Sequence, residues 1–113
     1  MREIGGVRIY GIALDGETRC AHYDESHDVI AIRFHCCGRY YPCFRCHEEV
    51  ADHPIEPWPG DRFDEPAVRC GACGTEHAIG TYLAMDHASP TCPACDHPFN
   101  PGCANHHGIY FDI

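Results

Sequence analysis

Twelve Cys and His residues in this chain have the types and spacings that bind metal ions. They are Cys20, His22, Cys36, Cys37, Cys43, Cys46, His47, His53, Cys70, Cys73, Cys92 and Cys95. A structural zinc site takes four thiolate or imidazole ligands that converge on one point. Twelve such residues complete three sites with none left over, so we expect three Zn2+ ions as the cofactors of this protein.

The C-terminal cysteines form the clearest of the three predicted sites. Cys70 and Cys73 make one Cys-x-x-Cys pair, Cys92 and Cys95 make another, and 18 residues separate the two pairs. This spacing is typical of a four-cysteine zinc ribbon. Glycines within and just after the first pair allow the tight backbone that such a knuckle needs. Four thiolates also accept iron in a rubredoxin-like site, so zinc and iron both remain open here.

The eight N-terminal residues divide into two further sites. One set is Cys20, His22, Cys43 and Cys46, and the other is Cys36, Cys37, His47 and His53. In this partition the sequence neighbours Cys46 and His47 bind different metal ions. A swap of Cys36 or Cys37 between the two sites satisfies the same ligand count, so the partition stays open.

Ten cysteines in a short chain also fit a disulfide framework, which is the main alternative to metal binding. Three Cys-x-x-Cys pairs and ten histidines favour metal instead. The first ten residues (MREIGGVRIY) lack the apolar stretch of a secretory signal. We therefore expect reduced, zinc-bound thiols and a cytoplasmic location.

The charge and hydropathy of the chain limit the classes of partner that we expect. Lys and Arg number 8 against 17 Asp and Glu, which gives a formal net charge of −9. Without a basic stripe for phosphate contacts, we expect no nucleic-acid partner despite the zinc-finger pattern. No apolar run reaches the roughly 18–20 residues that span a bilayer, so we expect no membrane insertion. Another protein remains as the expected partner of this acidic chain.

The composition predicts a fold with little regular structure. Aliphatic runs are short, and the chain contains 11 Gly and 9 Pro. Such chains gain stability from bound metal where the hydrophobic core is too small to supply it. We expect a small zinc-stabilised domain of short β-strands and irregular loops with zinc knuckles, in which the C-terminal part is zinc-ribbon-like.

Individual elements follow from residue type and alternation. Residues 4–14 predict a strand or hairpin, and 28–34 and 66–70 predict strands. The tail, 108–113, predicts a closing strand, and 48–52 a turn or two of helix. Beside the metals we expect small apolar clusters built from Ile30, Ile32, Phe34, Val68 and Ile79.

We expect one domain over residues 1–113, with an N-terminal two-zinc module (about 15–56) and a C-terminal one-zinc module (about 64–113). The Pro-rich stretch around Trp58 marks the predicted boundary. Trp58 has two interpretations, an exposed docking residue or a packing residue, whereas packing is favoured for Tyr40 and Tyr41.

The remaining Cys and His residues fit no complete site. For Cys103, with His106 and His107, a buried free thiol is favoured over a fourth metal site, because a fourth protein ligand is hard to find. Surface or packing roles are expected for His27, His35, His77 and His87.

Several motifs together resemble the CHY-type zinc finger family. They are Cys20-x-His22-Tyr23, IAIRFHCCGRYYPCFRCHEEVADH, AVRCGACG, CPAC and FNPGC, and the similarity runs from about residue 20 to 111. The resemblance implies three bound zinc ions, and all twelve ligand positions are occupied here. Larger relatives place this domain before the RING finger of ubiquitin ligases. This chain has no RING pattern, so ligase activity is not expected.

Two functions follow from these observations. Three closed sites predict a zinc-binding module whose rigid surface contacts another protein. The alternative is a zinc chaperone or redox-linked helper that takes zinc from a thiol-rich partner, as implied by small stand-alone members such as a fungal mitochondrial intermembrane-space helper. The site with two imidazoles is then the exchangeable one, since imidazoles protonate near neutrality. An enzyme is not expected, because a catalytic zinc keeps one coordination position open.

Overall fold

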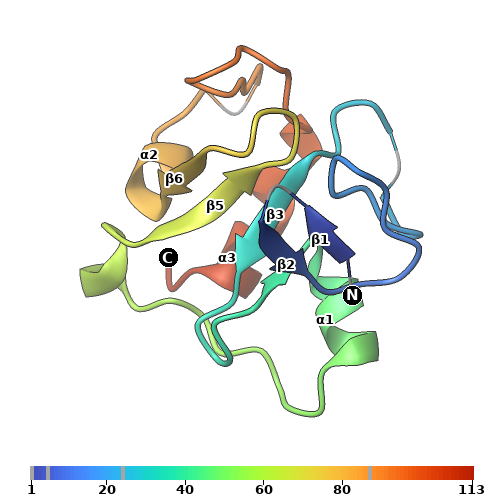
Figure 1. Cartoon of the computed structure of the whole chain (residues 1–113). Helices are drawn as coiled ribbons and strands as arrows, with labels where there is room; N and C mark the ends of the chain where they lie inside the picture. The colour runs from blue at the N-terminus through green and yellow to red at the C-terminus, as the bar shows by residue number, and fades with distance from the viewer. Residues whose placement is uncertain (1, 5, 24, 87) are drawn as a thin grey trace.

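One sheet of six short strands runs through the molecule (Figure 1). The computed structural model describes residues 2–4, 6–23, 25–86 and 88–113, without the side chains of 103–105. The strands are β1 (Arg2–Ile4), β2 (Val7–Ile9), β3 (Ile30–Arg33), β4 (Tyr40–Tyr41), β5 (Pro66–Cys70) and β6 (Glu76–Ala78). They lie in the order β1-β2-β4-β3-β5-β6, and each neighbouring pair is antiparallel except the parallel pair β2–β4.

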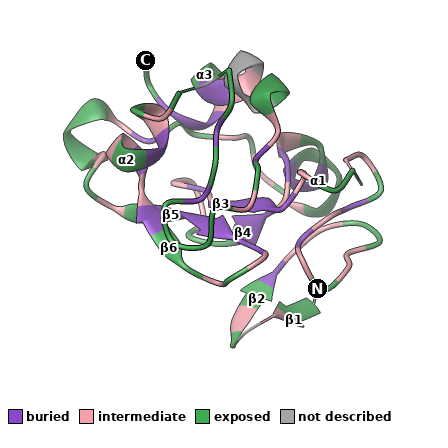
Figure 2. Cartoon of the chain, turned by 90° about the horizontal axis from the view of Figure 1, so that it is seen from above, coloured by how far each residue is buried: buried purple, intermediate pink, exposed green. Residues whose placement is uncertain are grey.

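Three short α-helices lie on one side of this sheet (Figure 2). The helices are α1 (Phe44–Val50), α2 (Ile79–Leu83) and α3 (His107–Tyr110). Two 3-10 turns, η1 (Gly60–Arg62) and η2 (Pro101–His106), complete the elements. The predicted helical turn at 48–52 is the end of α1, which begins earlier, within the segment that carries four of the predicted ligands.

The predicted strand at 28–34 is confirmed as β3, the centre of the sheet. Side chains of successive strand residues point to opposite faces. Ile30 and Ile32 accordingly join the main core, whereas Ala31 joins a second cluster with Ile9 and Tyr40. Burial on both faces explains why β3 reads as a continuous apolar run and why Figure 2 shows burial concentrated at the centre of the sheet.

The main core contains metal-binding side chains as well as hydrophobic ones. All five predicted core residues belong to it: Ile30, Ile32, Phe34, Val68 and Ile79. The cysteines in the same buried cluster are Cys20, Cys43, Cys46, Cys70 and Cys92. The expected packing beside the metals is therefore confirmed, as a single cluster that runs from one set of cysteines to the other.

The predicted strand at 66–70 is confirmed as β5, and it joins the two metal-bearing parts of the chain. β5 pairs with β3 through Ile30–Cys70, Ala31–Arg69 and Ile32–Val68. On its other edge β5 pairs with β6 across a local irregularity. A hairpin is present near the predicted segment 4–14, but it is formed by β1 and β2 and ends at Ile9; Gly5 lies outside the described residues.

The prediction of a closing strand at 108–113 is wrong. His107–Tyr110 forms α3, and only Phe111 makes a strand-like bridge, with Trp58. Two backbone hydrogen bonds hold this bridge, from Trp58 N–H to the Tyr110 carbonyl (2.9 Å) and from Asp112 N–H to the Trp58 carbonyl (2.8 Å). Of the β-type residues in the tail, Tyr110 and Phe111 pack in the core, whereas Ile113 is exposed.

The interpretation of Trp58 as an exposed docking residue is also wrong. Its side chain is 3 % exposed, and its indole N–H donates to the Arg33 carbonyl at 2.7 Å. Tyr40 and Tyr41 are buried too, as expected. A buried Trp58 joins the Pro-rich stretch to β3 and to the C-terminal segment, so this stretch is packed along its middle.

Candidate metal centres

The structure gathers the twelve predicted residues into three clusters of four. The first cluster is Cys20, His22, Cys43 and Cys46; the second is Cys36, Cys37, His47 and His53; the third is Cys70, Cys73, Cys92 and Cys95. In each cluster one ligand atom per residue lies within 4.8 Å of the others. Cys36 and Cys37 both lie beside the two histidines of the second cluster. The structure therefore shows the partition given first, in which neither cysteine changes sites.

The first cluster has the dimensions of a tetrahedral zinc site. Cys20 Sγ lies 3.6 Å from Cys43 Sγ. His22 Nδ1 lies 3.7 Å from Cys20 Sγ and 3.5 Å from both Cys43 Sγ and Cys46 Sγ. Zinc–sulfur bonds of about 2.3 Å place tetrahedral ligands about 3.8 Å apart, so the four donor atoms surround a space of the right size.

A carboxylate orients the histidine of the first cluster. His22 presents Nδ1 to the three sulfurs, while its Nε2 lies 3.1 Å from Glu49 Oε1. Hydrogen bonding to Glu49, and then to the Cys20 sulfur, raises the pKa of His22. A carboxylate on the outer nitrogen fixes the tautomer of a metal-binding histidine and increases its basicity. Glu49 lies on α1, as does Cys46, so one helix supplies both a ligand and its support.

The second cluster combines two thiols with two imidazoles. Cys36 Sγ lies 4.0 Å from Cys37 Sγ and 3.2 Å from His47 Nε2. The Nε2 atoms of His47 and His53 are 3.2 Å apart. Outside the cluster, His53 Nδ1 lies 3.1 Å from the carboxylate of Asp52, so His53 also has an orienting partner.

His47 differs from the other two histidines in the predicted sites. Its side chain is fully buried, stacked on Phe34 with ring centroids 4.6 Å apart and edge-on to Tyr41. Its outer nitrogen, Nδ1, has no hydrogen-bond partner among the residues that the structure describes. Burial, and then the neighbouring His53, lowers the pKa of His47. Beyond its Nε2 contacts within the cluster, the His47 ring is positioned by aromatic packing.

The third cluster brings two knuckles together. Cys70 Sγ lies 3.8 Å from Cys95 Sγ, and Cys73 Sγ lies 3.8 Å from Cys92 Sγ. Gly74 takes a positive φ of +81°, which favours glycine. The knuckle shape that the glycines predicted is therefore present at the end of β5.

His77 is a functional candidate that the sequence analysis placed only among surface or packing residues. It is buried on β6, and its Nε2 lies 3.3 Å from Cys92 Sγ. Burial lowers the pKa of His77, which leaves a neutral ring able to donate one N–H to a thiolate. The signal was absent from the sequence because His77 follows no ligand spacing and reaches Cys92 only through the fold.

Replacing His77 by leucine is expected to lower the zinc affinity of the third cluster about 10- to 100-fold, the usual effect of losing an outer hydrogen bond to a ligand. His77→Gln keeps an N–H donor on a side chain of similar length and should retain most of the affinity. Competition against a chromophoric chelator measures the difference. Equal affinities of the two variants would show that His77 only fills space.

The pKa values of the thiols differ within the first cluster and within the third. Hydrogen bonds from the Cys43 and Cys46 thiols hold the pKa of Cys20 far below its ordinary value. In the third cluster, hydrogen bonding to Thr75 lowers the pKa of Cys73 to about 6, whereas burial raises the pKa of Cys70 to about 12. Each of these clusters therefore contains a ready thiolate beside thiols that zinc must deprotonate. The sulfur and nitrogen donors, their number and their spacing fit zinc in all three clusters.

The remaining Cys and His residues make no further cluster among the described side chains. The side chain of Cys103, and all of His87, lie outside the described residues. His107 is buried with Nε2 3.1 Å from the Tyr82 hydroxyl, and the His106 ring lies 5.1 Å from that of Phe44. Both histidines have packing roles.

A small domain of short strands, with three Cys/His clusters suited to zinc, defines this chain as a zinc-binding domain. A family model described as CHY zinc finger matches residues 20–82. The chain belongs to the CHY zinc finger family, as its motifs indicated. The match includes the first and second clusters completely and the Cys70–Cys73 knuckle of the third.

Curated relatives cover nearly the whole chain. An uncharacterised protein of Schizosaccharomyces pombe is 44 % identical over 106 residues, which is 94 % of this chain and 90 % of the relative. A Saccharomyces cerevisiae protein named Helper of Tim protein 13 is 42 % identical, covering 91 % of this chain and 89 % of its own length. The Kluyveromyces lactis protein of the same name is 41 % identical over 93 % of this chain and 89 % of its own length. None of the helices formed by the described residues has the length and apolar character needed to cross a bilayer.

Proposed function

We propose that this protein is a non-enzymatic zinc protein that exchanges one zinc ion with a thiol-rich partner protein through its second cluster. The first and third clusters then keep the fold in place during exchange. The observation that carries this proposal is that Nδ1 of His47 has no hydrogen-bond partner among the described residues.

The donor set of the second cluster favours release. It has two thiolates, against three in the first cluster and four in the third. Thiolates bind zinc as anions. Imidazoles bind it as neutral ligands, and near pH 7 protons compete with zinc for the imidazole nitrogen. Cys36, Cys37 and His53 are also half-exposed, whereas the three cysteines of the first cluster are buried. Solvent and a partner's thiols therefore reach the second cluster more easily than the first.

His47 weakens the same cluster further. When Nε2 binds zinc, Nδ1 carries the proton, and that N–H is buried without an acceptor among the described residues. Outer hydrogen bonds of this kind typically contribute 10- to 100-fold to metal affinity. His22 in the first cluster has its carboxylate, Glu49. His47 therefore differs from His22, and from His53 with its partner Asp52, in having no outer hydrogen bond to a described residue.

The names of two relatives support a protein partner. Both are called Helper of Tim protein 13, and both align over nearly their full length with this chain. A helper of another protein is consistent with zinc exchange between proteins. Each cluster offers four protein ligands, which would leave a bound zinc no open position for a substrate, and this supports a protein without catalytic activity. The cytoplasmic location expected from the sequence stays a prediction.

Graded chelation of the zinc-loaded protein is expected to remove one ion before the other two. Native mass spectrometry should show a two-zinc species while the circular dichroism spectrum is unchanged. Alkylation of freed thiols, mapped on peptides, should label Cys36 and Cys37 before the cysteines of the other clusters. His53→Cys adds a third thiolate to the second cluster and should abolish this early loss.

His97→Cys is the matched control, because it adds a thiol outside the three clusters and should leave the early loss unchanged. If Cys73 and Cys95 are labelled first, exchange occurs at the third cluster and the proposal fails. If all three ions leave together as the protein unfolds, the metals are purely structural. The protein would then function as a rigid docking module.

A further inference from the structure

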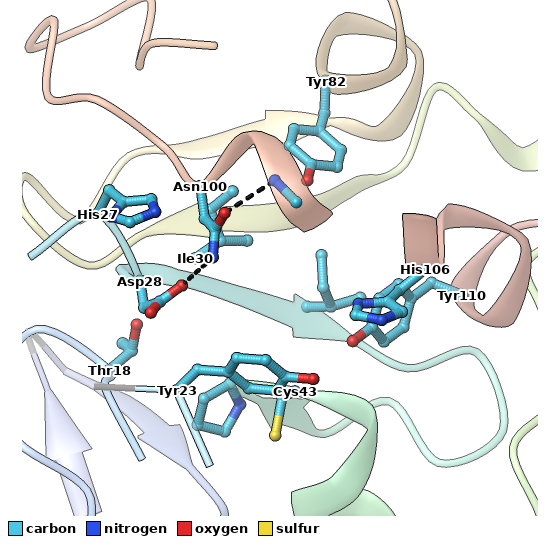
Figure 3. A pocket seen from close by; sticks show the side chains of 13 residues that line it. Thr18, Tyr23, His27, Asp28, Ile30, Cys43, Tyr82, Asn100, His106 and Tyr110 are labelled. Atoms are coloured by element: carbon cyan, nitrogen blue, oxygen red, sulfur yellow. Dashed lines mark hydrogen bonds between the residues drawn. The ribbon is translucent and has the colours of Figure 1, made fainter. Parts of the chain in front are cut away.

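A cavity of about 290 Å³ lies on the helix-bearing side of the sheet (Figure 3). Its walls come from segments far apart in the chain: the loop before β3, the strand itself, α2, and the C-terminal η2 and α3. Cys43 is the only residue of the three zinc clusters that lines it. The cavity is therefore distinct from the metal sites, although it shares one wall with the first cluster.

The cavity is large for a chain of 113 residues. Protein interiors seldom contain voids larger than a water molecule, and an engineered cavity of about 150 Å³ already holds benzene. Pockets for small ligands begin at about 300 Å³. The volume therefore corresponds to an occupant the size of a single amino-acid side chain or a small amine.

The residues that line the cavity form an apolar surface flanked by aromatic rings. Ile30 and Ile32 of β3 provide the aliphatic surface. Figure 3 shows Tyr82 and Tyr23 on opposite sides of the cavity, with Tyr110 at one end. Faces of tyrosine rings attract cations, and aliphatic side chains accept the methylene or ring portion of a ligand.

The other end of the cavity holds a fixed carboxylate. Asp28 accepts hydrogen bonds from Asn100 Nδ2 (2.7 Å) and from the Glu25 N–H (3.1 Å). Asn100 is itself fixed, because its Oδ1 accepts from the Gly102 N–H at 2.8 Å. This arrangement holds the Asp28 carboxylate at the cavity, as Figure 3 shows.

No described cation neutralises Asp28. No ion pair joins it to an arginine among the described residues, and the chain contains no lysine. The described residues that line the cavity include no arginine, and its two histidines, His27 and His106, form no ion pair with Asp28. A half-buried carboxylate gains from a cationic partner more than a fully solvated one does, because water screens it less.

We propose that this cavity binds a small organic cation, an ammonium or guanidinium group joined to an apolar body. The charged group lies at Asp28, and the body lies against Ile30 and Ile32 between the tyrosine rings. Free amines and the Arg or Lys side chains of polypeptides share this chemistry. The site is independent of zinc exchange at the second cluster, so either proposal can be wrong without affecting the other.

The test is a titration of the zinc-loaded protein at pH 8, monitored by two-dimensional amide NMR. The first probe is 2-phenylethylammonium, with 2-phenylethanol as its uncharged counterpart. The second is the peptide acetyl-Ala-Arg-Ala-amide, with citrulline replacing arginine in its counterpart. We expect shifts at Asp28, Ile30 and Asn100 with the cations and at least tenfold weaker binding of both counterparts. Tighter binding of the amine indicates a free ligand, and tighter binding of the peptide indicates a polypeptide source.

Asp28→Asn keeps the shape and, through its amide oxygen, the contact with Asn100; it gives up the hydrogen bond from the Glu25 N–H and removes the charge, so it should weaken cation binding about tenfold. Asp61→Asn, an exposed substitution in η1 with the same charge change, should not. Zinc content checks that both variants are folded. Equal binding of cations and counterparts to the unmodified protein, equal effects of the two substitutions, or no shifts at the cavity would each overturn the proposal.

Discussion

Replacing Cys46 by serine is expected to remove two zinc ions from the protein, not one. Cys46 and His47 are neighbours on α1, and a helix turns about 100° per residue, so their side chains point to different clusters. The helix has seven residues, whereas isolated helices shorter than about 12–15 residues are marginal in water. Zinc in the first cluster therefore holds α1 in place, and α1 presents His47 to the second cluster.

The expected loss of stability is large. Binding of structural zinc is worth about 10–16 kcal/mol in zinc-finger peptides, which is comparable to the whole unfolding free energy of a domain, about 5–15 kcal/mol. Cys46 is fully buried, so its serine variant also leaves a polar hydroxyl in the core. We expect one zinc per chain by native mass spectrometry and loss of the cooperative thermal transition.

Cys73→Ser is the matched comparison, because Cys73 is an exposed ligand of the third cluster. It should lose only the third zinc and keep a cooperative transition at lower temperature. Two zinc ions retained by the Cys46→Ser protein would show that the first and second clusters are independent, contrary to the coupling through α1.

Replacing Gly71 by alanine is expected to destabilise the protein by at least about 3 kcal/mol, the upper end of the usual cost of overpacking. A Cβ on Gly71 would lie 2.6 Å from the Val29 carbonyl oxygen and closer still to that of Glu17. These are backbone atoms with little freedom to move. The Val29 oxygen already accepts from the Gly71 N–H at 2.7 Å and from Thr18 Oγ1 at 2.8 Å.

The melting temperature of the Gly71→Ala protein should fall by roughly 10 °C or more. Its third cluster should also lose zinc to a chelator sooner, because Gly71 lies between Cys70 and Cys73. Gly60→Ala is the control, since a Cβ there meets no atom within 4 Å and the residue lies in η1. That variant should melt at the same temperature or slightly higher. Similar melting of the two variants would rule out the close approach at Gly71.

Local features of the fold and of the metal sites could be predicted from the sequence. A Cys-x-x-Cys knuckle such as Cys43–Cys46 is determined by a few consecutive residues, and so is the burial of an apolar strand such as Ile30–Arg33. The same holds for the turn chemistry of Gly74. The twelve residues that form the clusters could therefore be identified without a structure.

Features that depend on contacts between distant residues could not be predicted from the sequence. The tail, 108–113, has the residue types of a strand, but in the structure it contains the end of α3 and a single bridge from Phe111 to the buried Trp58. His77 looks unremarkable in sequence until β6 carries it to Cys92. In the same way, α1 and the aromatic core leave Nδ1 of His47 without an acceptor among the described residues.

The metal chemistry of this protein is encoded locally, because ligand type, ligand number and knuckle spacing can be recognised in short segments. The grouping of cysteines with histidines, the outer partners of the imidazoles and the position of Asp28 at an aromatic cavity depend instead on how the chain folds. These features arise from contacts between distant segments, which the pairing of the strands sets. Pairing of β3 with β5 places Ile30 opposite Cys70, and no local sequence pattern encodes that pairing.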